Sequence, residues 1–127
     1  MEWQFDSSAP IYAQLVDGIK LGIVSGELPP GARLPSVRDM ATEAGVNPNT
    51  MQRALQELER DALVYSQRTA GRFVTEDEEV IEAAKNALAQ ARVAQFFSAM
   101  SGLGFRPGEI LALIEVKVKE ASDDADL

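Results

Sequence analysis

The side chains with the clearest chemical potential lie between residues 47 and 60. Apolar residues recur there at helical spacing, so the opposite face of the expected helix carries mainly amide and guanidinium groups. In the major groove of DNA an amide can pair with adenine and a guanidinium can pair with guanine. A recognition helix uses its N-terminal residues for such contacts. The candidates for base contacts are Asn49, Thr50, Gln52 and Arg53.

A polar helix face can also be simply solvated, and the surrounding elements decide between these interpretations. The chain alternates between helical and extended periodicity, with turn residues at each change. Helices are expected at 9–24, 36–44 and 48–61, and strands at 63–67 and 72–75. Two short helices joined by a tight turn, followed by a hairpin, predict a winged helix-turn-helix. In that arrangement the polar face is more than a solvated surface.

Capping residues define the joint between the second and third helices. Ser36 and Asp39 form a capping arrangement, and Asn47 precedes Pro48, which suits the first position of a helix. Gly45 ends the second helix. Ser36 and Asn47 can equally donate hydrogen bonds to phosphate, so both are candidates for DNA contact.

A C-terminal segment, 76–127, follows the hairpin. A long alanine-rich helix is expected over 77–100. The last element, 107–121, is expected to be a helix, although part of it alternates like a strand. Residues 122–127 are expected to form a frayed acidic tail. The fold class is therefore α+β and mostly α: a winged helix-turn-helix domain at 1–75 with a short helical dimerisation segment after it.

Composition excludes several kinds of active site. The chain has no Cys and no His, which excludes disulfides, Cys/His zinc sites and Cys–His or Ser–His catalysis. It has no glycine-rich phosphate loop, and its carboxylates do not converge as a pair. We therefore expect neither an enzyme nor a bound cofactor or metal.

The net charge of −8 argues against a nucleic-acid partner only when it is taken over the whole chain. Between Arg33 and Arg72 there are 6 arginines and 5 acidic residues, whereas residues 76–127 hold 5 basic and 11 acidic ones. The local charge of the binding face decides DNA binding, and the total predicts weak non-specific binding. The acidic C-terminal part leaves one alternative open: a winged-helix protein-interaction module without specific DNA binding.

The start of the chain, MEWQFDSSAP, lacks the basic region and apolar core of a signal peptide. No apolar run approaches the ~18–20 residues of a membrane span. We therefore expect a cytoplasmic protein with no membrane partner.

Three stretches of the chain resemble the DNA-binding domain of the GntR family of bacterial transcription regulators. They are PIYAQLVDGIKLGIVSGELPPGARLPSVRDMA, GVNPNTMQRALQELERDALV and GRFV. The VNPNT turn and the brief C-terminal region are similar to the YtrA-like subfamily. The resemblance is strong over residues 9–75 and extends over 76–121 by size and helical character. It implies a transcriptional repressor that binds a palindromic site on double-stranded DNA as a homodimer.

The resemblance adds a DNA contact on the second helix. The arginine of the LPSxR segment is Arg38, and the matching arginine contacts DNA in the family. A surface ion pair with Asp39 or Glu43 is the alternative explanation for Arg38.

The hairpin and the third helix depart from the family pattern. Family members carry Gly, a basic residue and Gly at the hairpin tip, where this chain has Thr69, Ala70 and Gly71. Loss of the first Gly restricts how closely the backbone can approach the minor groove. Pro48 stands where some members carry a base-reading arginine. The candidates left in the hairpin are Arg68, Gly71 and Arg72.

The alanine-rich face of the long C-terminal helix is the expected dimer interface. Packing onto the chain's own winged domain is the alternative, but two helices alone cannot bury both of their apolar faces. Residues 76–121 are also too few for an enclosed effector pocket of ~300–1,000 Å3, so no dedicated effector domain is expected and the effector is unknown. The expected interface residues are Val80, Ala84, Ala87, Leu88, Ala91, Ala94 and Phe97.

Overall fold

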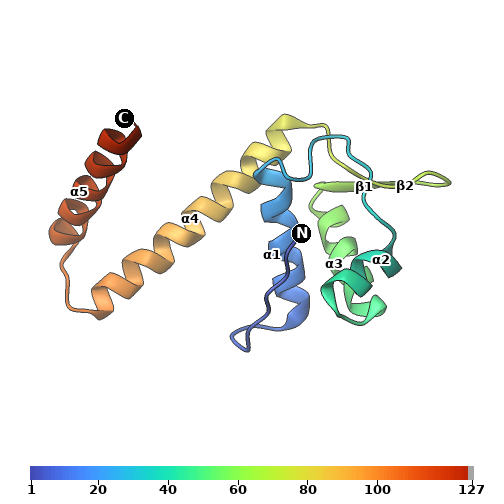
Figure 1. Ribbon diagram of the computed structural model, residues 1–127, viewed down its shortest axis with the longest axis horizontal. Coiled ribbons are helices and arrows are strands. Elements are labelled where there is room, and N and C mark those ends of the chain that lie inside the picture. The colour runs from blue at the N-terminus through green and yellow to red at the C-terminus, as the bar shows by residue number, and fades with distance from the viewer. Residues whose placement is uncertain (126–127) are drawn as a thin grey trace. The chain divides into compact units, whose positions relative to one another are not determined.

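The computed structural model describes residues 1–125 and contains five helices and a two-stranded sheet (Figure 1). The elements are α1 (Ile11–Val24), α2 (Val37–Ala44), α3 (Pro48–Arg60), β1 (Val64–Gln67), β2 (Gly71–Val74), α4 (Glu78–Gly102) and α5 (Pro107–Ala125). This order confirms the predicted winged helix-turn-helix followed by two C-terminal helices.

Contacts divide the chain into two compact units, Met1–Asn86 and a second that begins at Ala87. The first unit contains the winged helix and the first turns of α4. The division after residue 75 that the sequence suggests stays a prediction. None of the helices within residues 1–125 is long and apolar enough to cross a membrane.

The joint between α2 and α3 forms from the capping residues that the sequence marks. The Ser36 side chain accepts a hydrogen bond from the Asp39 amide at 3.1 Å, and the Asn47 side chain accepts one from the Asn49 amide at 2.7 Å. Gly45 has φ +70°, a left-handed conformation that side chains with a Cβ adopt only with strain. The turn therefore ends α2 at Ala44 and allows α3 to start at Pro48.

Backbone hydrogen bonds attach the wing to the segment between α1 and α2, in addition to the chain connection from α3. β1 and β2 pair antiparallel, with Val64 opposite Val74. Residues 32–34, between α1 and α2, run beside β2, where the Leu34 amide donates to the Arg72 carbonyl at 2.8 Å and the Val74 amide donates to the Ala32 carbonyl at 2.8 Å. The wing is therefore fixed against the segment that enters α2.

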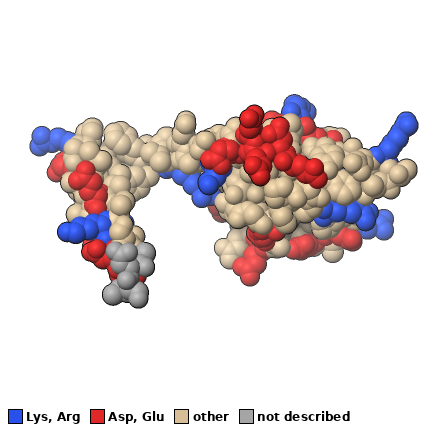
Figure 2. Space-filling model, turned by 90° about the horizontal axis from the view of Figure 1, so that it is seen from above, with Lys and Arg blue, Asp and Glu red and all other residues tan. Residues whose placement is uncertain are grey.

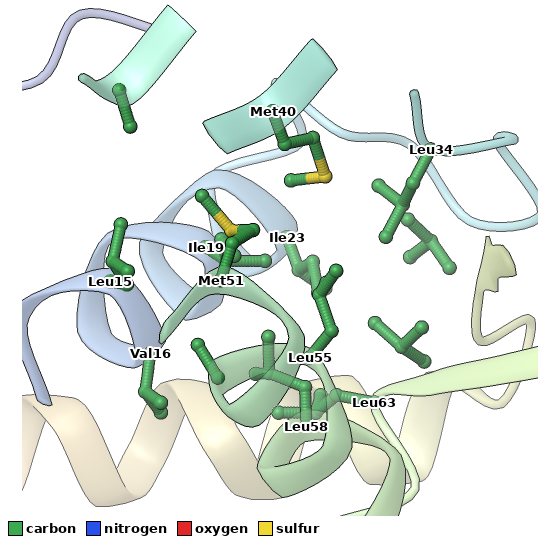
Figure 3. Close-up of a cluster of buried hydrophobic side chains, with 14 of the residues drawn as sticks. Leu15, Val16, Ile19, Ile23, Leu34, Met40, Met51, Leu55, Leu58 and Leu63 are labelled. Atoms are coloured by element: carbon green, nitrogen blue, oxygen red, sulfur yellow. The ribbon is translucent and has the colours of Figure 1, made fainter. Parts of the chain in front are cut away.

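One apolar core holds α1, α3 and the wing together (Figure 3). Its largest members are fully buried and come from all three parts: Leu15, Ile19, Ile23, Met51, Leu55, Leu58, Leu63, Val64 and Val74. Trp3 and Phe5 stack at 5.6 Å between ring centroids and pack against the same core. This contribution of the N-terminal segment is not apparent from residue types or spacing.

Most predicted helix ends lie within two residues of the observed ones, and the last helix differs more. The first helix, expected from residue 9, begins at Ile11, and Pro10 precedes it as the N-cap. The expected frayed tail is wrong for residues 122–125, because α5 continues to Ala125. No Gly or Pro interrupts the chain between Glu109 and Ala125, so the helix has no local reason to end earlier. The remainder of the predicted tail, residues 126–127, lies outside the described residues.

In the second unit, α5 confirms the predicted helix over 107–121. Ile110 is buried, but large apolar side chains along both helices are not: Val93 is 64% exposed, Leu103 72% and Leu111 57%. A surface of this kind is unusual for a helix that packs only within its own chain.

Shortening a core side chain of α3 should destabilise the winged helix strongly. Leu55 is fully buried, so Leu55→Ala removes its packing and leaves a cavity, at a cost of ~2–5 kcal/mol. Urea unfolding followed by far-UV circular dichroism measures this loss. The matched control is Leu21→Ala on α1, where the side chain is 42% exposed and the expected loss is below about 1 kcal/mol. Equal losses for both variants would contradict the described core.

Candidate nucleic-acid interface

The two faces of α3 separate as the sequence predicts. Met51, Ala54, Leu55 and Leu58 are fully buried. Away from them, Asn49, Arg53, Gln56 and Arg60 are exposed, and Thr50 and Gln52 are partly buried on the flanks. The outer face therefore presents amide and guanidinium groups that the core does not use.

Ser36 and Asn47 both act as helix caps, with the hydrogen bonds described above. At the start of α3 Pro48 has no amide hydrogen, and the amides of Asn49, Thr50 and Met51 already donate to Asn47, so an anion there would have to meet side chains. Contact of Ser36 and Asn47 with phosphate stays a prediction.

Arg53 lies on the outer face but folds back toward α1. Its guanidinium carbon is 4.0 Å from the centroid of the Tyr12 ring, a cation–π contact. The Tyr12 hydroxyl donates to Glu57 at 3.0 Å, and this hydrogen bond, with burial and the negative charge of Glu57, raises the pKa of the phenol. Glu57 also accepts from Arg60 at 2.8 Å. α1 thus positions Arg53, the arginine predicted to contact bases, and the sequence did not reveal this contact.

The two hairpin arginines lie in different surroundings. Arg68 is exposed at the turn between β1 and β2. The Arg72 side chain is only 19% exposed, and its Nε donates to Glu59 on α3 at 2.6 Å. Arg72 Nη1 also donates to the Gln52 side-chain oxygen at 3.3 Å. Arg72 therefore joins the wing to α3, whereas Arg68 extends into solvent.

Glu59 receives two charge-stabilising contacts, from Arg72 and from the Ser66 hydroxyl. Partial burial raises the pKa of this carboxyl, but the hydrogen bond from Ser66 and the ion pair with Arg72 together outweigh burial. The pKa of Glu59 consequently lies below its ordinary value of 4.5.

Gly71 has a conformational role in the wing. Its φ is +106°, and a Cβ at this position would lie 3.1 Å from Arg33 Nε. The backbone angle therefore favours glycine, whereas the Arg33 side chain would need to shift only slightly to admit a Cβ. Arg33 is exposed beside the wing, a position that its place in the sequence does not indicate.

Arg38 is exposed on α2 and takes part in none of the ion pairs among residues 1–125. The proposed alternative, a surface pair with Asp39 or Glu43, is therefore absent from the described part of the chain. Arg38 remains available for an anionic partner.

Part of the alanine-rich face of α4 packs onto the winged helix, and the rest is exposed. Val80 and Ala84 are partly buried and pack against the core of the winged helix, which is the alternative that the sequence left open. Leu88 is partly buried. The rest of the predicted interface is exposed: Ala87, Ala91, Ala94 and Phe97.

Charge is unevenly distributed over the surface of the winged helix. Figure 2 shows basic side chains at the end of the molecule where the hairpin lies and a group of acidic ones over the start of α4. The first turn of α4 contains Glu78 and Glu79. Residues 1–125 contain no group of three or more side chains placed to hold a metal ion. The total charge of the chain therefore does not describe every part of the surface of the winged helix, because the hairpin end carries basic side chains.

Comparison with known proteins identifies relatives of this arrangement. Residues 11–74 match the family model described as "Bacterial regulatory proteins, gntR family". The chain is 42% identical over 111 residues, 87% of its length, to the uncharacterized HTH-type transcriptional regulator YhcF of Bacillus subtilis, of which it covers 92%. It is 41% identical over 71 residues to the HTH-type transcriptional repressor YtrA of the same organism. This match covers 56% of this chain and 55% of YtrA.

Among solved structures, a GntR family transcriptional regulator from Listeria monocytogenes superimposes with a TM-score of 0.79 at 42% identity. The match covers 87% of this chain and 97% of the Listeria protein. The similarity thus includes the C-terminal helices as well as the winged helix.

Removing the Glu59 carboxylate, which links α3 to the wing, should lower the free energy of unfolding by an amount that depends on pH. Because the folded pKa of Glu59 lies below the unfolded one, its carboxylate stabilises the fold above pH 4.5, and this contribution is lost as the pH falls through the lower folded pKa. Glu59→Gln should therefore cost about 1 kcal/mol at pH 7 and nothing below the folded pKa. Urea unfolding at several pH values measures this difference, with the exposed Glu82→Gln as control. A cost for Glu59→Gln that does not change with pH would show that the carboxylate is not held as described.

Proposed function

Because the chain belongs to the GntR family and is a DNA-binding transcriptional regulator, we propose that it is a repressor that binds a palindromic operator as a homodimer. In such a dimer each recognition helix enters one major-groove half-site, and the half-site centres lie about 34–36 Å apart or a multiple of that distance. The family is one of regulators and not of enzymes.

The polar outer face of α3 is the observation that carries the proposal. Asn49, Arg53 and Gln56 are exposed while the opposite face is fully buried, so these side chains have no role in the core. Amide and guanidinium groups at the N-terminal end of such a helix form hydrogen bonds with base edges. We assign base contacts to this face and, with it, the sequence preference of the protein.

Exposed arginines on both sides of α3 support contacts with the DNA backbone. Arg38 projects from α2 and Arg68 from the hairpin turn, and neither takes part in an ion pair among the described residues. Phosphate contacts of this kind fix orientation and supply affinity by counterion release. Since the whole chain has a charge of −8, few cations are left to provide this attraction.

The exposed apolar surface of the second unit supports a homodimer. An open apolar groove follows α4 along Ala89, Val93 and Phe97, and α5 exposes further large apolar side chains. Covering such a surface with the same surface of a second copy satisfies both chains at once and gives the two-fold symmetry that a palindrome requires. Repression follows from steric exclusion of other proteins at the operator, and one relative, YtrA of Bacillus subtilis, is named a repressor.

A charge placed in the groove should separate the dimer. Val93 is 64% exposed within the chain, so Val93→Asp leaves the fold intact but places an unpaired carboxylate in the proposed interface. Sedimentation at micromolar concentration should give twice 13.8 kDa for the unmodified protein and 13.8 kDa for the variant. Arg92→Asp, a neighbouring exposed position outside the groove, is the control and should stay dimeric. A monomeric unmodified protein would refute the homodimer and favour a different protein as the occupant of this surface.

Loss of a phosphate contact should weaken binding to all DNA sequences alike. Arg38→Ala is expected to lower affinity for the operator and for a scrambled duplex by the same factor, and to reduce the log–log salt slope by about 2, since a dimer loses two contacts. Fluorescence anisotropy across a salt series, with an operator selected from random DNA, measures both quantities. Arg92→Ala, on α4 outside the winged helix, is the control. An unchanged affinity and slope for Arg38→Ala would remove Arg38 from the interface.

A further inference from the structure

The contact between Arg72 and Gln52 orients the amide on α3. Arg72 Nη1 lies 3.3 Å from Gln52 Oε1. A guanidinium can only donate hydrogen bonds, so the amide must turn its oxygen toward Arg72 and its NH2 group away. An isolated glutamine side chain has no such restriction.

Arg72 is itself firmly placed. Its Nε donates to Glu59 at 2.6 Å, and the Ser66 hydroxyl donates to the same carboxylate. Ser66 and Arg72 are opposite each other in the hairpin, and the Arg72 carbonyl accepts from the Leu34 amide. With its side chain only 19% exposed, Arg72 has a fixed position from which it orients Gln52.

The orientation changes which base Gln52 can read. Paired bonding with adenine needs the amide oxygen to accept from N6 while the NH2 group donates to N7. In this chain the oxygen is turned toward the wing and already accepts from Arg72, so the two N–H donors are the groups best placed to bond a base. Guanine is the base that presents two acceptors, O6 and N7, on its major-groove edge.

We propose that Arg72 is a positioning residue that turns Gln52 into a donor-only reader and thereby gives it a preference for guanine over adenine. The inference rests on the proposed function, because it requires that the outer face of α3 reads bases. It reverses the adenine preference that the residue type alone suggests for Gln52.

Selection of bound duplexes from a random pool tests this proposal with the full-length protein. The Gln52→Ala variant first identifies the base pair that Gln52 reads, as the position whose preference it alone relaxes. At that position the unmodified protein should prefer guanine to adenine by about tenfold. Arg72→Met, which keeps side-chain length but cannot donate, should shift the guanine-to-adenine ratio by about tenfold toward adenine.

Two further variants distinguish a change in base preference, caused by the orientation of the Gln52 amide, from a change in affinity for all DNA sequences. Arg68→Met removes the exposed hairpin arginine and should lower affinity for all sequences while leaving the base ratio unchanged. Gln52→Glu offers acceptors and no donors, so it should abolish the guanine preference even though Arg72 is intact. Thermal unfolding of each variant verifies the fold, and if Arg72→Met is unfolded the base that the unmodified protein selects at the position read by Gln52 decides, because adenine there overturns the proposal.

The possible failures are distinguishable. If the unmodified protein enriches no sequence, the proposed function is wrong. If it enriches a palindrome but selects adenine at the position read by Gln52, or if Arg72→Met is folded and keeps the original ratio, the role of Arg72 is wrong. Failure of Gln52→Ala to relax any base pair would likewise overturn the inference.

Discussion

Packing of α3 against α1 is the contact on which the remaining features of the winged helix depend. Met51, Leu55 and Leu58 are fully buried against a core to which α1 contributes Leu15 and Ile19. Burying this face fixes the rotation of α3 about its own axis, because apolar residues at helical spacing can satisfy only one face. The polar groups of α3 are exposed as a consequence, and the core beneath holds the backbone that carries them.

Polar contacts at the two edges of α3 then refine what the core establishes. On one edge Tyr12 of α1 lies under Arg53 and donates to Glu57. On the other edge Arg72 of the wing contacts Glu59 and Gln52. Such partly buried contacts add little to stability, but they restrict the rotamers of long side chains that would otherwise be mobile. A recognition surface gains specificity when its donors and acceptors are held in place before binding.

The long helix α4 links two environments and serves a different purpose in each. Its first turns contribute Val80, Ile81 and Ala84 to the core of the winged helix. From Val93 onward its large apolar side chains are exposed, as are most of those of α5. The periodicity of the alanine-rich face runs through both parts, so the pattern alone did not show where packing within the chain stops.

The sequence by itself determined the local structure and the two faces of α3. Caps at Ser36 and Asn47, the turn at Gly45 and the apolar spacing act between residues close in the chain, and their effects can be read directly from residue types. Tertiary structure alone decided the contacts of Arg53 with Tyr12, of Arg72 with Gln52 and of the N-terminal aromatic residues with the core. These pairs are far apart in the sequence and become neighbours only when the core fixes the elements, and side chains as long as arginine can meet several partners. Residue type therefore indicated which groups could bond DNA, whereas packing determined which of their donors and acceptors were already occupied.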